Sequence, residues 1–269
     1  MSSSRTVTVL GFGNIARDLV PALLSNGAGL LILSHDASKL KGVPLGVATA
    51  MADYTNEKQL EGLFKAHKVE AVVSTASGSD EFFRYTQVGI ARAAKESGVQ
   101  LFVTNEFGVA NDGHDPKSVF GAKSEAAARI SKEVGLPTAR VFNGLFIEWI
   151  PIVTAYASKP GAFVVAGKGD TKASFTAIAD IAGFVAHIVT AAPLSEISNR
   201  IFLIEGQVAT FNEIAQILGR EVTYTALEEI ADPISRLLQR GVEEGWMRTG
   251  AGPGYPPSSS KEIERRSSS

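Results

Sequence analysis

The sequence has no cysteine among its 269 residues. A disulfide framework, a thiolate nucleophile and a cysteine-ligated metal site are therefore excluded. Neither sign of charge is in excess, since the formal net charge is −2, which argues against nucleic acid or an anionic membrane as a partner. No apolar run approaches the ~18 residues of a membrane span. We therefore expect a globular protein located in the cytoplasm.

Two further kinds of chemistry lack their usual patterns. The four histidines, at positions 35, 67, 114 and 187, are widely scattered, and no spacing is typical of a metal site, so we predict no metal. No G-x-S-x-G motif is present, which disfavours a serine hydrolase. The hydrophobic fraction of 45% is ordinary for a protein that buries a large core.

The most informative segment lies at the start of the chain, where the apolar run 6–10 leads directly into G-F-G-N-I-A. A strand followed by G-x-G-x-x-A at the start of a helix is typical of a dinucleotide-binding unit. Gly11 permits the tight turn, and Gly13 leaves room for a pyrophosphate beside the backbone. The predicted cofactor-binding residues here are Gly11, Phe12, Gly13, Asn14 and Ile15. The alternative is a turn with a structural role only.

Strand-like and helix-like segments alternate along the chain. The predicted strands cover about residues 6–10, 30–33, 46–50, 71–74, 101–104, 138–142, 163–165 and 200–203. Predicted helices cover about residues 15–23, 57–66, 82–97, 117–133, 178–191 and 210–218. This alternation predicts an α/β protein with a Rossmann-type doubly wound parallel sheet and a smaller C-terminal substrate-binding lobe. We expect an NAD(P)-binding core at 5–145, a lobe at 146–248 interleaved with the core sheet, and a flexible tail at 249–269.

The end of the second predicted strand is where the adenosine ribose lies in this architecture. Ser34 and His35 could hydrogen-bond a 2′-phosphate there, and Lys39 could neutralise it. Asp36 would repel the phosphate if its side chain pointed inward. We therefore favour NADP(H) as the cofactor and keep NAD(H) as an alternative. A solvated loop without a ligand is the structural alternative.

Two further loops are candidates for contact with the cofactor. Asp53, after the third predicted strand, could accept a hydrogen bond from the adenine amine. Thr75, Ala76 and Ser77 are small side chains after the fourth strand, which would let the cofactor lie across the sheet edge. Both segments could instead be ordinary exposed loops.

Four motifs in this order, G-F-G-N-I-A, T-N-E-F-G, K-S-V-F-x-x-K and F-N-G-L-F-I-E, resemble the NmrA-like, isoflavone-reductase-like branch of the atypical short-chain dehydrogenases/reductases. The resemblance covers about residues 5–220. It implies that the segment with Thr104, Asn105 and Glu106 borders the nicotinamide, although the family usually has S-E-F-G or S-E-W-G there. Phe142, Asn143 and Gly144 leave the next strand toward the same crevice, and Phe107, Phe146 and Trp149 could line an apolar substrate pocket. Core packing is the alternative for these aromatic residues.

Lys123 is the candidate catalytic residue. Typical short-chain dehydrogenases have a tyrosine four residues before a lysine, but here that position holds Val119. The resemblance implies a reductase branch that relies on the lysine alone, which Lys123 matches by position. A lysine can transfer a proton near neutral pH when desolvation or a nearby positive charge lowers its pKa. The alternatives are that Lys123 holds the nicotinamide ribose or is an ordinary surface lysine on an amphipathic helix.

These observations predict a reductase that transfers hydride from NAD(P)H to a small apolar, aromatic or conjugated substrate. The alternatives are a non-catalytic NAD(P)-sensing regulator, which the NmrA-like resemblance also implies, and an isomerase or cyclase that uses bound cofactor. The expected partner is a small-molecule substrate, without nucleic acid or membrane, and a homodimer is left open.

Overall fold

The computed structural model describes residues 5–155 and 161–250. These residues form two compact units, each built from several stretches of sequence. Unit 1 contains residues 5–106, 114–141 and 178–202, and unit 2 contains residues 107–113, 142–155, 161–177 and 203–250. Residues 251–269, most of the predicted tail, lie outside the described residues. The predicted domains at 5–145 and 146–248 stay a prediction.

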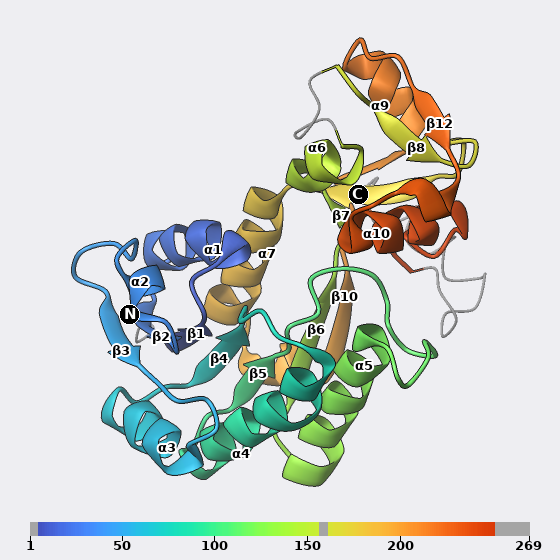
Figure 1. Ribbon diagram of the computed structural model, residues 1–269. Coiled ribbons are helices and arrows are strands. Elements are labelled where there is room, and N and C mark those ends of the chain that lie inside the picture. Colours follow the sequence, from blue (N-terminus) through green and yellow to red (C-terminus); the bar gives the residue numbers. More distant parts are fainter. Residues whose placement is uncertain (1–4, 156–160, 251–269) are drawn as a thin grey trace. The chain divides into compact units, whose positions relative to one another are not determined.

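Unit 1 is built on a seven-stranded sheet in the order β10-β6-β5-β4-β1-β2-β3 (Figure 1). Its strands are β1 Thr6–Leu10, β2 Gly29–Ser34, β3 Ala48–Met51, β4 Ala71–Ser74, β5 Leu101–Val103, β6 Thr138–Phe142 and β10 Arg200–Leu203. The pairings from β6 to β3 are parallel. Because the chain winds from β1 to β3 in one direction and from β4 to β6 in the other, the strand order reverses between β1 and β4. In such sheets, ligands bind beyond the carboxyl ends of the strands at this reversal.

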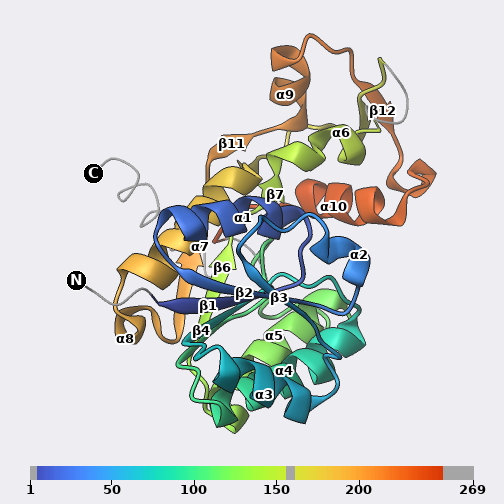
Figure 2. The ribbon, with the colours of Figure 1, turned by 90° about the vertical axis from the view of Figure 1, so that its left-hand side faces the viewer.

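Helices cover both faces of this sheet, and its inner strands are almost entirely buried (Figures 1 and 2). The helices of unit 1 are α1 Asn14–Ser25, α2 Ala37–Leu40, α3 Glu57–Ala66, η1 Phe82–Gln87, α4 Val88–Glu96, α5 Val119–Arg129, η2 Ile130–Val134, α7 Ile178–Ala191 and α8 Leu194–Ile197. Helices α1 and α7 pack together on one face, and α3, α4 and α5 cover the other. The doubly wound α/β prediction is therefore confirmed.

The predicted helix 82–97 differs in one respect from the structure. Its first part, η1, is a π-helix, and regular α-helix begins only at Val88. Hydrophobic periodicity predicts a helix here without distinguishing a short π turn from an α-helix. The predicted end is confirmed, because Gly98 follows the helix with a φ of 88°, a left-handed conformation that favours glycine.

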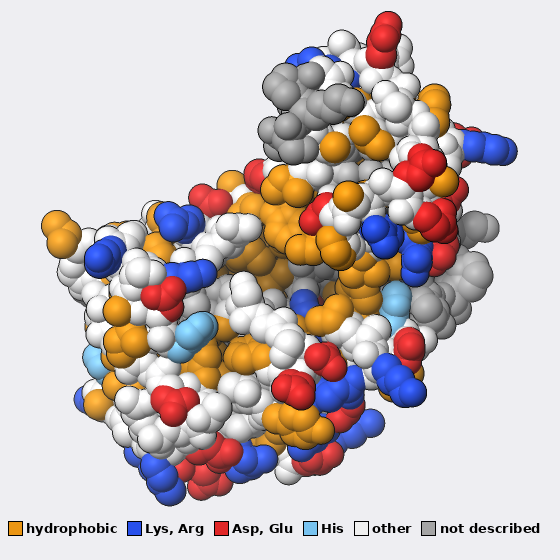
Figure 3. Space-filling model, in the orientation of Figure 1, with side chains coloured by type: hydrophobic (Ala, Val, Ile, Leu, Met, Phe, Trp, Pro, Cys, Tyr) orange, Lys and Arg blue, Asp and Glu red, His pale blue; other side chains and the backbone are white. Residues whose placement is uncertain are grey.

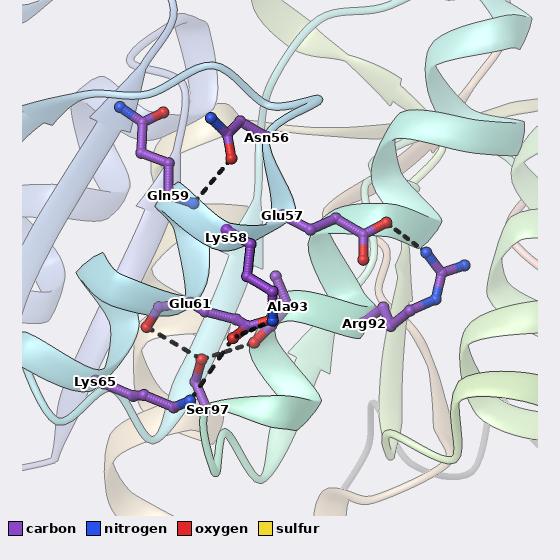
Figure 4. A network of polar contacts seen from close by, with 9 residues as sticks. All are labelled: Asn56, Glu57, Lys58, Gln59, Glu61, Lys65, Arg92, Ala93 and Ser97. Atoms are coloured by element: carbon purple, nitrogen blue, oxygen red, sulfur yellow. Dashed lines mark hydrogen bonds and ion pairs between the residues drawn. The ribbon is translucent and has the colours of Figure 1, made fainter.

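The outer face of α3 and α4 is strongly charged (Figure 3). Lys58 and Lys65 both pair with Glu61 along α3, and Glu57 pairs with Arg92 of α4 (Figure 4). Such exposed pairs contribute at most about 1 kcal/mol each. This face is therefore an ordinary solvated surface, and the site lies elsewhere in unit 1.

Unit 2 contains two small sheets and short helices. One sheet has the order β11-β9-β7, and the other pairs β12 with β8. Its elements are β7 Leu145–Phe146, η3 Ile147–Trp149, α6 Ile150–Val153, β8 Val164–Ala166, β9 Ala173–Thr176, β11 Gln207–Ala209, α9 Phe211–Ile217, β12 Thr223–Thr225, η4 Leu227–Glu229 and α10 Pro233–Glu243. Across all the described ranges, no helix combines the length and the apolar character that crossing a membrane requires.

Candidate active site

The glycine turn joins β1 to α1. Gly11 has a φ of 79°, and a Cβ there would lie 2.9 Å from the Cα of Ala76. Gly13 is the N-cap of α1 and makes no side-chain capping hydrogen bond; a Cβ there would meet nothing within 4 Å. The first N–H groups of α1 therefore have no cap from Gly13, at a helix end that favours anions.

At the end of β2, the polar side chains have different hydrogen-bond partners. The Ser34 hydroxyl is buried and bonds to the backbone N–H and carbonyl of Asp36 at 3.0 Å each. The Asp36 carboxylate accepts hydrogen bonds from the backbone and hydroxyl of Ser38 at 2.9 and 2.7 Å, and these bonds lower its pKa. It thereby caps α2. His35 and Lys39 remain exposed.

One cation near the glycine turn was missed by the sequence analysis. The Arg17 guanidinium lies over the Phe12 ring, with Cζ 5.6 Å from the ring centroid. Its Nη1 also lies within 3.8 Å of the place where a Cβ on Gly42 would be. Arg17 follows the G-x-G-x-x-A motif by one residue, a position from which a cation could have been anticipated.

The loop after β3 is held by its own side chains. The Asp53 carboxylate accepts hydrogen bonds from the backbone and hydroxyl of Thr55, at 2.9 and 2.7 Å, and these bonds lower its pKa. The neighbouring Tyr54 is buried and donates its hydroxyl to the carbonyl of Leu33 at 2.8 Å. Its ring also contacts that of His35, with centroids 5.5 Å apart. The sequence analysis did not identify Tyr54, and Asp53 as an adenine ligand stays a prediction.

The ends of β1, β4 and β5 are tied together by hydrogen bonds. Thr75 donates its backbone N–H and its hydroxyl to the Leu10 carbonyl at 3.0 and 2.8 Å. The Ala76 carbonyl accepts a 2.6 Å bond from the side-chain amide of Asn105. Ser77 is exposed beside them. The predicted residues of three strand ends therefore lie next to one another in unit 1.

Lys123 lies beside this group of strand ends. Its ammonium donates to the backbone carbonyl of Glu106 at 2.9 Å and lies 4.9 Å from the centroid of the Phe83 ring. Burial lowers the pKa of Lys123, and the negative charge of Glu106 partly opposes that shift. Val119, where a dyad would have tyrosine, is the first residue of α5.

Contacts within unit 1 thus link the glycine turn to Lys123. The backbone of Ala76 lies against Gly11, and the Ala76 carbonyl accepts a hydrogen bond from Asn105. Glu106 follows Asn105 in the chain, and its carbonyl accepts the hydrogen bond of Lys123. Within the described part of the chain, no group of three or more histidine, aspartate or glutamate side chains could hold a metal ion.

The remaining predicted residues belong to unit 2. Phe142 and Asn143 are fully buried, and Gly144 has a φ of 70° with Ser174 so close that a Cβ would lie 2.4 Å from its carbonyl oxygen. Among the described residues, the buried Oδ1 of Asn143 has no hydrogen-bond partner. Phe107 is buried with a φ of 33°. The rings of Phe146 and Trp149 contact edge to face, 5.3 Å between centroids.

Comparison with models of protein families shows to which family the chain belongs. The model of the NmrA-like family matches residues 3–239. The chain belongs to the NmrA-like family. The resemblance noted from the four motifs is therefore confirmed for almost the whole chain.

Solved structures show the same fold for this NmrA-like chain. AtPrR2, solved with NADP+ and (+)pinoresinol, superimposes with a TM-score of 0.73 at 22% identity, over 92% of this chain and 90% of that one. Leucoanthocyanidin reductase from Vitis vinifera, in a ternary complex, gives 0.73 at 20% identity, over 93% and 92%. Triphenylmethane reductase from Citrobacter sp. gives 0.73 at 16% identity, over 91% and 92%. No curated protein sequence matches the chain.

Proposed function

We propose that this protein is an NADP(H)-dependent reductase that transfers hydride to a small apolar, aromatic or conjugated substrate, with Lys123 as the proton donor. The observation that carries the proposal is the continuous set of contacts from the glycine turn through Ala76 and Asn105 to Lys123. It unites a phosphate-binding element and a desolvated lysine at one edge of the sheet.

The residues present fit a dinucleotide. The start of α1 lacks a side-chain cap, and the space beside Gly13 is open, so this helix end would hold the pyrophosphate. When bound, the cofactor supplies the hydride, and the protein orients it and provides the proton.

Three features support NADP(H) over NAD(H). The Asp36 carboxylate, which would repel a 2′-phosphate, is occupied by capping α2. His35 and Lys39 are exposed beside it and can approach a phosphate. AtPrR2, a structure of the same fold, was solved with NADP+. NAD(H) is the alternative that a binding comparison would reveal.

Lys123 suits proton transfer because it is partly buried, which disfavours its charged form. Burial lowers its pKa toward the range where a lysine can exchange a proton. The Glu106 carbonyl accepts a hydrogen bond from the ammonium at 2.9 Å. Val119 has no hydroxyl, so it could not act as the proton donor in place of Lys123. Lys123 would therefore donate the proton that balances hydride addition to a carbonyl or a conjugated double bond.

The substrate would be apolar and aromatic. Phe107, Phe146 and Trp149 offer aromatic surface, and the lobe at 146–248 is our candidate for the substrate-binding part. The proteins of the same fold include one solved with (+)pinoresinol and a triphenylmethane reductase that acts on dyes, both aromatic compounds. We therefore include pinoresinol and a triphenylmethane dye among the first test substrates.

The test combines cofactor binding with turnover. Calorimetric titration with NADPH should give saturable binding, and a panel of aromatic and conjugated substrates should include one that oxidises NADPH in a manner dependent on Lys123. Binding without any turnover would favour the sensing regulator instead. Conversion of a substrate without net NADPH oxidation would favour an isomerase or cyclase.

A further inference from the structure

Glu106 and Arg140 form a buried ion pair beside the candidate active site. The Arg140 Nε donates to the Glu106 Oε1 at 3.0 Å, and their side chains are only 11% and 1% exposed. The Thr104 hydroxyl donates to the same oxygen at 3.0 Å. The Glu106 carboxylate is therefore held from two strands, β6 and the end of β5.

The same residue holds the candidate proton donor through its main chain. The Glu106 carbonyl accepts the hydrogen bond of the Lys123 ammonium, whereas the carboxylate of Glu106 faces Arg140. The backbone N–H of Glu106 bonds to the Thr104 carbonyl at 2.9 Å, which closes a tight turn directly after β5. The bond from the Thr104 hydroxyl to the carboxylate and this backbone bond together hold Glu106 in the turn that presents its carbonyl to Lys123.

Two arginines that pack near α5, the helix that carries Lys123, have partners of their own. On η1, Arg84 pairs with Glu125 of α5 and also donates to the Pro116 carbonyl. At the end of α5, Arg129 pairs with Glu133 and donates to the Arg84 carbonyl. Burial lowers the pKa of Lys123, and the negative charge of Glu106 opposes that shift.

We propose that Glu106 and Arg140 act as a positioning pair for Lys123: Arg140 fixes Glu106, whose carbonyl orients the ammonium and whose carboxylate, balanced by Arg140, sets how readily Lys123 releases its proton. This proposal rests on the proposed function of Lys123. A buried carboxylate without a counter-ion would hold the lysine proton firmly, whereas a balanced one permits its release. The pair thereby tunes the proton donor without touching the substrate.

The two members of the pair should shift the pKa of Lys123 in opposite directions. Glu106→Gln removes the charge that favours the ammonium, so the pKa should fall. Arg140→Met leaves that charge unbalanced, so the pKa should rise. The opposite signs of the two shifts, relative to the wild type, are the expected result.

Competitive acetylation of the full chain over a range of pH, read by peptide mass spectrometry, measures the pKa of Lys123 without any substrate. Arg140→Lys should retain most of the wild-type value, because it keeps the charge. The matched control is Arg92→Met, which breaks the exposed pair between Arg92 of α4 and Glu57 of α3 and should leave the pKa of Lys123 unchanged (Figure 4). Thermal unfolding of each variant is followed in parallel.

Opposite shifts for Glu106→Gln and Arg140→Met, with no shift for Arg92→Met, support the positioning pair. The proposal is refuted if both variants lose stability while the pKa of Lys123 stays unchanged. It is also refuted if both variants shift that pKa in the same direction. If Arg140→Met does not fold, Glu106→Gln decides: a pKa that does not fall refutes the proposal. Because acetylation needs no turnover, failure of the reductase proposal would show separately, as an unchanged rate in Lys123→Ala.

Discussion

The two glycines of the β1–α1 turn should fail in different ways when they are replaced. Gly13→Val introduces a side chain where a Cβ meets nothing within 4 Å, at a φ of −100° that valine can adopt. Its cost is the poorer N-cap, about 1 kcal/mol or less, which corresponds to a fall in melting temperature of at most ~4 °C. Loss of two charge-assisted bonds to a phosphate, at about 1.5–3 kcal/mol each, should weaken NADPH binding more than ~100-fold.

Gly11→Ala provides the matched comparison. A left-handed alanine costs about 1–2 kcal/mol, and displacement of the Ala76 backbone, 2.9 Å from the new Cβ, adds about 1–3 kcal/mol. The main effect of this variant should therefore be a lower melting temperature rather than weaker NADPH binding. Thermal unfolding without cofactor and calorimetric titration with NADPH separate the two effects. Normal NADPH binding by Gly13→Val, or a melting temperature of wild-type value for Gly11→Ala, would refute the reasoning.

Three further predictions concern the chemistry and the cofactor. Lys123→Ala should lower kcat by about 10²–10⁴-fold at saturating NADPH, and Lys123→Arg should not restore it, because a guanidinium does not release a proton near neutral pH; a large loss of NADPH affinity with kcat unchanged would instead make Lys123 a ribose ligand. Because burial lowers the pKa of Lys123, kcat should fall as pH rises through a midpoint below the ordinary 10.5, and this alkaline limb of the pH–rate profile should be absent from Lys123→Ala. Lys39→Ala should weaken NADPH binding about tenfold in calorimetry while NADH binding stays the same; equal losses for both cofactors would contradict a contact with the 2′-phosphate.

The parts of the fold that the sequence predicted well depend on local chemistry. The G-x-G-x-x-A turn needs a glycine at a left-handed φ and an open helix end, and both requirements are visible in six adjacent residues. The apolar face of α1, with Ile15, Leu19 and Leu23, is buried as its spacing predicts. Such features can be predicted from the sequence because they depend only on residues that are close together in the chain.

Other features depended on partners distant in the sequence. Gly144 was predicted to leave its strand toward the nicotinamide, which stays a prediction, and the structure adds that the carbonyl of Ser174 lies where a Cβ on Gly144 would be. That contact joins residues thirty positions apart, and no local pattern reveals it. Whether Asp36 faces the ribose or caps α2 also depends on one side-chain rotation, although Ser38 two residues later is typical of a capped turn.

The ion pair of Glu106 and Arg140 lies between these two cases. Arg140 is a charged residue within the otherwise uncharged strand β6, and a buried charge is costly unless an opposite charge pairs with it. The parallel register places Val103 opposite Ala139, so Glu106 follows β5 close to Arg140. Strand β6 also borders β10, which Glu205 follows, so the strand order alone leaves two acidic candidates. A strand alignment would therefore have narrowed the partner of Arg140 to Glu106 or Glu205, and the structure selects Glu106.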